Sequence, residues 1–382
     1  MLPRIKEVDT MMNAIEGINQ IAQDMQAYLT DFRNTSGKNV IAVMHPVVPQ
    51  EVIYAAGLHP IRLFPSIGEP ISLAHTNLHI YTSSIFRAIW DQVLKGHYPN
   101  VDGVVLPESC ETVTFFARGW KWHRPDDFVA TLGVRFKKTE NAINFFSKEI
   151  ARLAKTMGDF SGKEVSADSL SGAIRVYNRN RELLRKVYDL RKDESPPISG
   201  VEAFKIMMVS FLMDKEENNQ LLEQLLDELQ NRKEKAKPKA RLMVSGPCIV
   251  DGRLIETMES SGALVVADDT NTGSRSFWHA VDPNQDPLLA LARGYSKVPC
   301  PFATSADDRF DYISRMVSEY GVNGVVFAVE KWCESEKMDF PYLEHAIDGK
   351  LGVPVTFVET EYLCDMAPIR TRIDGFVESI TG

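Results

Sequence analysis

Short apolar segments alternate with amphipathic segments in both end regions of the chain, and this alternation limits the possible folds more than any other feature. In the first region it predicts helices at 49–57 and 82–95, and strands at 39–44, from Pro60 onward and at 102–107. After residue 240, helices separate four predicted strands, at 241–246, 263–269, 323–333 and 354–360, and the last of these helices is expected at 341–352, starting at Pro341. Such alternation is typical of the α/β class, in which helices cover both faces of a parallel sheet.

The middle of the chain lacks strand signals. From about residue 139 to 236, apolar residues recur at helical spacing, and the charged stretch 232–240 is typical of a linker. The first ~30 residues also predict an amphipathic helix. The chain has 382 residues, which is more than a single hydrophobic core usually holds. We therefore expect three parts: an α/β lobe with a leading helix at 1–138, a helical segment and linker at 139–238, and a second α/β lobe at 239–382.

Charge and hydropathy exclude several classes of protein. The formal net charge is −9, so the overall field repels nucleic acid and anionic membrane surfaces. No apolar run approaches the ~20 residues needed to span a bilayer. The first 20 residues carry acidic side chains and no continuous apolar core, which is unlike a signal peptide. We expect a cytoplasmic protein that binds neither nucleic acid nor membranes.

The five cysteines are widely spaced and form no C-x-x-C pair; they are Cys110, Cys248, Cys300, Cys333 and Cys364. An odd number in a large cytoplasmic chain argues against a disulfide framework. The absence of C-x-x-C excludes a zinc ribbon or a ferredoxin-type run. Three interpretations remain: buried structural thiols, a nucleophile, or a site assembled from distant parts of the chain.

Two of these cysteines follow similar segments. NVDGVVLPESC (100–110) and GVNGVVFAVEKWC (321–333) share the frame D/N-G-V-V, an apolar stretch and a final cysteine. Ligands of doubly wound sheets gather beyond the carboxyl ends of the strands, so Cys110 and Cys333 would meet in a cleft if the lobes face one another. Cys248, which follows the predicted strand 241–246, is a weaker candidate for a functional residue in that cleft. Cys300 and Cys364 are interpreted as structural or incidental. A nucleophilic cysteine would need a histidine, but nothing in the sequence fixes the geometry of His45, His59, His75 or His79.

Charged residues near predicted element ends have structural as well as functional interpretations. Glu51 lies in the first turn of a predicted helix, where a carboxylate favours the helix dipole; a catalytic carboxylate in the cleft is the alternative. Asp268 and Asp269 end a strand and would bind substrate polar groups or water. Arg275 and Lys331 would face anionic phosphates or act as ordinary surface charges.

Several longer segments together resemble the smaller (beta-type) subunits of the 2-hydroxyacyl-CoA dehydratase and benzoyl-CoA reductase family. They extend in order over nearly the whole chain: PQEVIYAAGLHPIRLF, LKGHYPNVDGVVLPESCET, GKEVSADSLSGAIRVYNRNRELLRKVYDLR, SSGALVVADDTNTGSRSF and GVNGVVFAVEKWCESEKMDFPYLEHAIDGKLGVPVTFVETEY. The resemblance implies two flavodoxin- or Rossmann-like lobes with a helical insertion and a second homologous subunit in a heterodimer. It also implies a [4Fe–4S] cluster on three cysteines, an ATP-dependent iron–sulfur activator and an acyl-CoA substrate.

Carried over residue by residue, the resemblance assigns two of the three cluster cysteines. They fall on Cys110 and Cys333, whereas the first family cysteine falls on Ser83. Iron–sulfur clusters normally take thiolates, so a serine at this place leaves three options. Ser83, His79 or an exogenous ligand completes a modified cluster; Cys248 substitutes from another loop; or this subunit holds no cluster. Glu51 matches a glutamate of the family's P-x-E-x-I-x-A-A-G stretch and is a candidate acid/base or positioning group.

The resemblance leaves three functions open. The leading one is an oxygen-sensitive (R)-2-hydroxyacyl-CoA dehydratase, which eliminates water through a ketyl radical on the thioester after one-electron activation. The second is a benzoyl-CoA-reductase-type subunit that reduces an aromatic acyl-CoA. The third is a non-catalytic partner subunit that has lost its cluster, an interpretation favoured by Ser83 and opposed by the retained pair Cys110 and Cys333.

Overall fold

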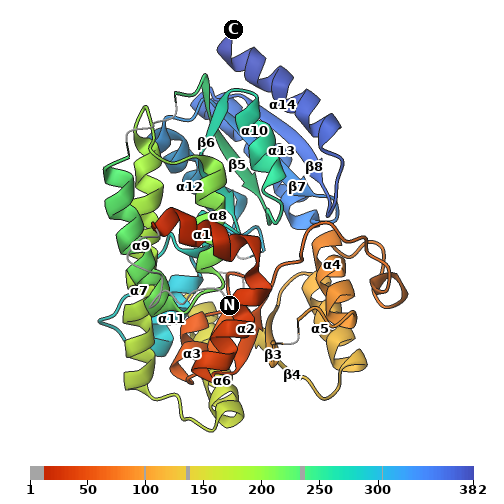
Figure 1. Cartoon of the computed structure of the whole chain (residues 1–382), viewed down its shortest axis with the longest axis vertical. Coiled ribbons are helices and arrows are strands. Elements are labelled where there is room, and N and C mark those ends of the chain that lie inside the picture. The colour runs from red at the N-terminus through yellow and green to blue at the C-terminus, as the bar shows by residue number, and fades with distance from the viewer. Residues whose placement is uncertain (1–12, 99, 135–137, 233–236, 303) are drawn as a thin grey trace.

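The computed structural model describes residues 13–98, 100–134, 138–232, 237–302 and 304–382. These residues form an α/β fold with two four-stranded sheets, ordered β2-β1-β3-β4 and β6-β5-β7-β8. All strand pairs are parallel. The expected fold class, with two parallel-sheet lobes and helices between them, is confirmed (Figure 1).

The first sheet contains the four strands β1 (Val40–Val43), β2 (His59–Arg62), β3 (Gly103–Glu108) and β4 (Phe128–Gly133). Its connecting helices are α3 (Gln50–Ala55), α4 (Ser84–Leu94) and α5 (Glu111–His123), and a short 3-10 turn lies at Ala74–Thr76. Every residue of β1 and β2 is buried. A parallel strand covered on both faces is expected to be continuously apolar, as VIAV in β1 is.

The second sheet repeats this topology. Its strands are β5 (Ala240–Gly246), β6 (Ala263–Thr270), β7 (Gly324–Glu330) and β8 (Val355–Thr360). The helices of this lobe are α10 (Arg253–Ser260), α12 (Ala306–Tyr320), α13 (Glu334–Leu351) and α14 (Met366–Thr381), with a 3-10 turn at Ser274–Ser276. Strands β1 and β3 of the first sheet thus correspond to β5 and β7 of the second.

The middle of the chain is helical, as expected. It contains α6 (Glu140–Ser161), α7 (Ala167–Asp189), α8 (Gly200–Ser210) and α9 (Lys215–Gln230), with a 3-10 turn at Leu190–Lys192. Helix α6 packs on β4, and α8 packs on β6. The chain after β6 returns to the first lobe, where α11 (Pro287–Tyr295) packs on α6. The three-part division at 138 and 238 stays a prediction, and the packing of these helices links both lobes.

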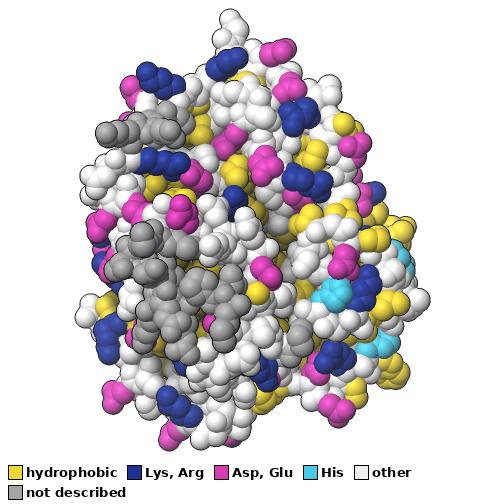
Figure 2. Space-filling view, in the orientation of Figure 1, with side chains coloured by type: hydrophobic (Ala, Val, Ile, Leu, Met, Phe, Trp, Pro, Cys, Tyr) yellow, Lys and Arg dark blue, Asp and Glu magenta, His cyan; other side chains and the backbone are white. Residues whose placement is uncertain are grey.

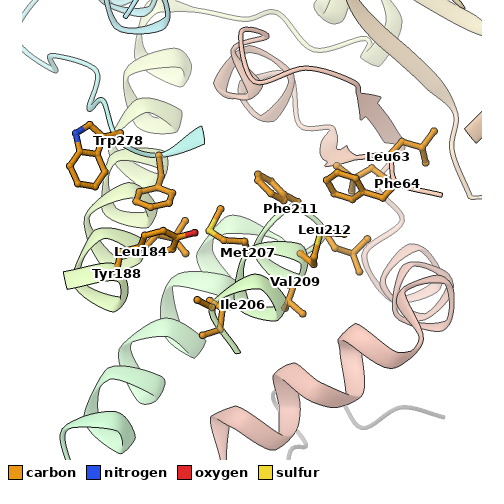
Figure 3. Close-up of a cluster of buried hydrophobic side chains, with 14 of the residues drawn as sticks. Leu63, Phe64, Leu184, Tyr188, Ile206, Met207, Val209, Phe211, Leu212 and Trp278 are labelled. Carbon is orange, nitrogen blue, oxygen red and sulfur yellow. The ribbon is translucent and has the colours of Figure 1, made fainter. Parts of the chain in front are cut away.

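Helix α8 is central to this linkage. Figure 3 shows side chains of α8 and of the residues that directly follow it, with Phe211 toward Phe64 of the first lobe and Met207 toward Tyr188 of α7. The rings of Phe64 and Phe211 lie 5.7 Å apart. These residues are buried members of one continuous apolar cluster that also includes Trp278 of the second lobe. Burial of this apolar surface stabilises the arrangement of the lobes.

Several elements differ from the sequence-based expectation. From residue 14 the leading helix is two helices, α1 (Ala14–Gln23) and α2 (Met25–Ser36), because Asp24 caps the second one; the expected helix also covers residues 1–12, which lie outside the described ranges. Strand β4 and helices α5 and α11 were not predicted. Helix α13 begins directly after Cys333, and Pro341 lies inside it rather than at its start.

The surface is uneven in character. In Figure 2, hydrophobic and histidine side chains gather at the right edge, over α4 and α5, whereas charged side chains are spread over the upper lobe. Of the eight large hydrophobic residues that are exposed in the described ranges, six lie between 67 and 122, namely Ile67, Leu73, Ile80, Tyr81, Phe115 and Trp122. Among the described helices, none has the length and apolar character that a membrane crossing requires.

Candidate functional site

A cavity of about 640 Å³ lies between the carboxyl ends of the two sheets. Four loops that contribute to its wall follow the central strands β1, β3, β5 and β7, and they carry His45, Cys110, Cys248 and Cys333. Parallel sheets place ligands at this end because strand ends and helix starts meet there. The two lobes therefore face one another across the cavity, which is the condition under which Cys110 and Cys333 were expected to meet.

Cys110 and Cys333 occupy equivalent places, each as the residue preceding a helix. Cys110 is the N-cap of α5 and Cys333 the N-cap of α13. Burial raises the pKa of the Cys110 thiol, and backbone N–H groups at the start of α5, first that of Val113, oppose this rise. Burial likewise raises the pKa of Cys333, with the backbone N–H of Glu336 opposing. Helix N-termini favour a thiolate, so both thiols suit a cationic ligand such as iron.

Two further thiols line the same cavity. Cys248 is partly buried, and Cys300 is 5% exposed. The interpretation of Cys300 as structural or incidental stays a prediction; the residue is part of the cavity wall, with its Sγ 3.6 Å from Nε2 of His45. No local pattern marks it, since its loop returns to the cavity from a part of the chain distant in sequence. Cys364 is not among the lining residues that the structure describes.

His45 is the histidine that sequence reasoning undervalued. Burial lowers its pKa to about 3, and the positive charges of Arg62 and Arg275 add to this effect. The imidazole is therefore neutral at neutral pH, and its Nδ1 accepts a hydrogen bond from the backbone N–H of Val47 at 3.3 Å. His79 also lines the cavity, next to Tyr81, which packs edge-on against Trp332 with ring centroids 4.7 Å apart. His59 lies elsewhere, with its Nε2 2.9 Å from the carbonyl oxygen of Leu212.

Ser83 lies on the cavity wall at the start of α4. As the N-cap residue it would ordinarily accept a hydrogen bond from the first turn, but its side chain makes no capping bond. The carboxylate of Glu330, the last residue of β7, takes that role from the other lobe: Ser84 donates to its Oε1 from N at 2.6 Å and from Oγ at 2.7 Å. Because Glu330 caps the helix, the Ser83 hydroxyl is not used for capping.

A buried ion-pair network supports the second lobe beneath Cys333. Arg275 donates to Asp269 through Nε at 2.6 Å and to Glu336 through Nη1 at 2.8 Å. Arg309 donates to Glu336 at 2.7 Å and to Asp339 at 2.9 Å. The expectation that Arg275 is a surface charge or faces phosphates is wrong, because its side chain is fully buried among carboxylates.

The other charged candidates lie in distinct environments. Glu51 is fully buried, where it accepts hydrogen bonds from Arg181 at 2.5 Å and from Tyr295 at 2.6 Å. It is not among the described residues that line the cavity, and its suggested acid/base role stays a prediction. Lys331 forms a partly exposed ion pair with Glu361 at 2.8 Å. Asp268 accepts a hydrogen bond from the backbone N of Ser274 at 2.8 Å.

The cysteine thiols that line the cavity are the type of ligand that an iron–sulfur cluster takes. Within the described ranges, no three His, Cys, Asp or Glu side chains converge as the ligands of a single metal ion would. A four-iron cluster spaces its thiolate ligands farther apart than one ion does, and thiols are the ligands such clusters take. Cys110 and Cys333 provide thiols to the cavity from opposite lobes. A bare serine at position 83 does not supply the third thiolate.

The fold and cavity define a two-lobed α/β protein with a thiol-lined site between its lobes. The model of the family described as "2-hydroxyglutaryl-CoA dehydratase, D-component" matches residues 46–380, so the chain belongs to this family. The chain is 26% identical to one of the subunits of benzoyl-CoA reductase from Thauera aromatica, over 90% of this chain and 91% of that protein. It is 23% identical to the (R)-phenyllactyl-CoA dehydratase beta subunit of Clostridium sporogenes, over 94% and 96%. It is 22% identical to the beta subunit of lactoyl-CoA dehydratase from Anaerotignum propionicum, over 97% and 100%.

Proposed function

We propose that this chain is the beta-type subunit of an oxygen-sensitive (R)-2-hydroxyacyl-CoA dehydratase. Family membership supports the assignment, and two of the relatives above are beta subunits of such dehydratases. The observation that carries the proposal is the placement of Cys110 and Cys333 on one cavity, each at the start of a helix. These are the two positions at which the family resemblance assigns cluster ligands.

Cys110 and Cys333 would hold a [4Fe–4S] cluster in the cavity, with Ser83 beside them at the place of the missing family cysteine. A bound cluster supplies single electrons at low potential, which is the chemistry that elimination through a ketyl radical on the thioester requires. The chain's own residues orient and protect this site. Backbone N–H groups of α5 and α13 point toward the two sulfurs, and these donors tune a cluster's potential.

Aromatic residues would limit access of water to the site. Phe86, Phe115, Phe302 and Trp332 line the cavity, and the Tyr81–Trp332 pair borders it. Excluding water protects a reactive radical from side reactions. Glu330 would fix the start of α4, and with it Ser83, against the second lobe. The chain's own residues would thus bind and orient the cluster and shield the site from water.

The activity would need further components. A second homologous subunit would complete a heterodimer, since the relatives are themselves subunits of larger enzymes. An ATP-dependent iron–sulfur activator would supply the electron, and the substrate would be an acyl-CoA thioester. Because the chain is acidic overall, recognition of the anionic thioester needs local positive charge or the partner's surface.

A benzoyl-CoA-reductase-type role is the second candidate, favoured by the 26% identity to a subunit of that enzyme. Electron stoichiometry separates the two. A dehydratase recycles its electron and makes many products per electron supplied, whereas a reductase consumes two electrons per turnover. The third candidate, a non-catalytic partner subunit, is favoured by Ser83 alone and predicts a complex whose activity does not depend on Cys110.

The test uses the anaerobic complex of this chain with its partner subunit, reduced by activator and ATP and then given a panel of 2-hydroxyacyl-CoA esters. We expect enoyl-CoA in large molar excess over electrons, lost in Cys110→Ala and retained in Cys364→Ala. Two electrons consumed per product would instead identify a reductase. Full activity in Cys110→Ala would overturn the catalytic role of this subunit.

A further inference from the structure

The shared topology of the lobes gives Cys248 a specific place. His45 lies two residues beyond the end of β1, and Cys248 lies two residues beyond the end of the corresponding strand, β5. In the same way Cys110 lies two residues beyond β3, and Cys333 lies three residues beyond β7. All four residues line the cavity. Cys248 therefore occupies in the second lobe the position that a histidine occupies in the first.

The loops that carry Cys248 and Cys333 leave adjacent strands. Strands β5 and β7 are paired in parallel, with Ser245 opposite Phe327, and paired strands lie about 4.8 Å apart. Gly246 ends β5 so close to β7 that any Cβ there would overlap the carbonyl oxygen of Ala328. This close approach brings the start of the Cys248 loop beside the strand that leads to Cys333.

Hydrogen bonds on both sides of Cys248 hold its backbone in place. The N–H of Asn271 donates to the carbonyl of Pro247 at 2.9 Å. The N–H of Ile249 donates to Oγ1 of Thr272, also at 2.9 Å. Both partners belong to the loop after β6, so the backbone on each side of Cys248 is tied to that loop. Ligands held in this way are positioned before the group they bind arrives.

A buried cation without a carboxylate partner acts electrostatically on this thiol. Arg62 is 4% exposed, its Nε has no hydrogen-bond partner, and its Nη1 reaches only the carbonyl of Asn271, at 3.5 Å. Throughout the ranges that the structure describes, no carboxylate forms an ion pair with Arg62. Burial raises the pKa of Cys248, and the charge of Arg62 is the largest opposing influence. The guanidinium lies over the rings of Phe64 and Phe211, 5.8 and 5.2 Å from their centroids, which compensates only part of the cost of a buried charge. An anionic sulfur at Cys248 would lower that cost further.

Cys300, the other spare thiol, has a different environment. It is buried to 5% exposure, and its Sγ already lies against Nε2 of His45 at 3.6 Å. Cys248 keeps partial exposure, as Cys110 and Cys333 do. Of the two thiols, Cys248 is the one that shares the exposure, the strand-end position and the lobe of an assigned ligand.

We propose that Cys248 supplies the third protein thiolate of the iron–sulfur site, in place of the family cysteine that Ser83 replaces. The inference rests on the proposed function, since it requires the cluster. On binding iron, the thiol loses its proton to solvent and forms one Fe–S bond, with no change in oxidation state. A third thiolate from the second lobe would leave the Ser83 side of the cavity open to substrate.

The test compares variants of the full chain after anaerobic reconstitution, by iron and acid-labile sulfide content and by the electron paramagnetic resonance spectrum of the reduced protein. We expect about four irons per wild-type chain. In Cys248→Ser we expect at least about a twofold loss of iron or conversion to a three-iron signal. Cys300→Ala is the matched control, and it should keep the wild-type iron content and spectrum.

A rescue variant keeps the test decisive. Cys248→Ser combined with Ser83→Cys should regain the wild-type iron content, because it returns a thiolate to the cavity; circular dichroism verifies the fold of each variant. Wild-type iron and an unchanged spectrum in Cys248→Ser would overturn this inference and leave the proposed function standing. Loss of iron in Cys300→Ala alone would also overturn it. A wild-type protein that takes up no iron would overturn the proposed function itself.

Discussion

Glu330 of β7 caps a helix of the opposite lobe: its Oε1 lies 2.6 Å from the backbone N of Ser84 and 2.7 Å from the Ser84 Oγ. The two residues are 246 positions apart in sequence, and both are buried. The Ser84 Oγ in turn accepts a hydrogen bond from the N–H of Tyr362 at 2.8 Å. This contact joins the lobes at the edge of the cavity and places Ser83 opposite the second lobe.

Removing this cap should destabilise the protein. Glu330→Ala leaves the N–H and hydroxyl of Ser84 without an acceptor, which we expect to cost about 2–3 kcal/mol of unfolding free energy. Glu330→Gln keeps one oxygen acceptor and should cost about 1 kcal/mol. Urea denaturation measures both values. The control is Glu361→Ala, which removes a partly exposed ion pair and should cost under about 1 kcal/mol. Equal stability of Glu330→Ala and the control would contradict the capping role.

The buried network around Arg309 should be far more sensitive than an exposed ion pair. Arg309→Met leaves Asp269, Glu336 and Asp339 with fewer partners in a buried site, and we expect a loss of about 3–5 kcal/mol. Lys155→Met breaks the exposed pair with Asp159 and should change stability by about 0.5 kcal/mol or less. Thermal and urea unfolding measure both. Similar effects of the two substitutions would show that the network does not stabilise the second lobe.

Lys215 should make stability depend on pH in the alkaline range. Burial lowers its pKa to about 7, although Asp214 opposes this, and its Nζ donates to the carbonyl of Ser210. Between the folded value near 7 and the unfolded value of 10.5, the unfolded chain binds a proton that the folded chain does not. The stability contribution of the lysine is therefore lost as pH falls from about 10 to 7.

The comparison with Lys215→Met isolates this effect, since methionine keeps the length of the side chain without the charge. The unfolding free energy of the wild type relative to the variant should rise with pH from 7 to 10, by up to about 1.4 kcal/mol per pH unit. Below pH 7 the difference should be constant. A difference that is flat from pH 7 to 10 would show that Lys215 keeps its proton in the folded protein.

The sheets were predictable where burial is continuous. Segments 39–44, 102–107 and 263–269 are apolar through most of their length, and they form β1, β3 and β6 within one or two residues. Strand β4 was missed. Its first residues, Phe128 and Val129, are only half-buried, so this strand is not continuously buried as β1 and β6 are. Pro341 suggested a helix start, since proline favours the first turn, but α13 begins earlier, at the turn that Cys333 caps.

The sequence predicted the main cysteines of the site, but it predicted the positions of the charged residues much less well. The repeated frame before Cys110 and Cys333 marked both cysteines, and the rule that sites lie beyond strand ends would also have found His45. Cys300 and Glu330 reach the cavity through tertiary folding that no local pattern encodes. The burial of Arg275 was not foreseeable either, because its partner Glu336 lies 61 residues away.

Iron and acid-labile sulfide content, with a visible spectrum, is the measurement that bears most directly on the proposed cluster. It requires protein purified strictly without oxygen, beside the Cys110→Ala variant. We expect a brown protein with about four irons and four sulfides per chain, and a colourless Cys110→Ala variant that stays folded. A colourless wild-type protein that also fails chemical reconstitution would show that this subunit has no redox role.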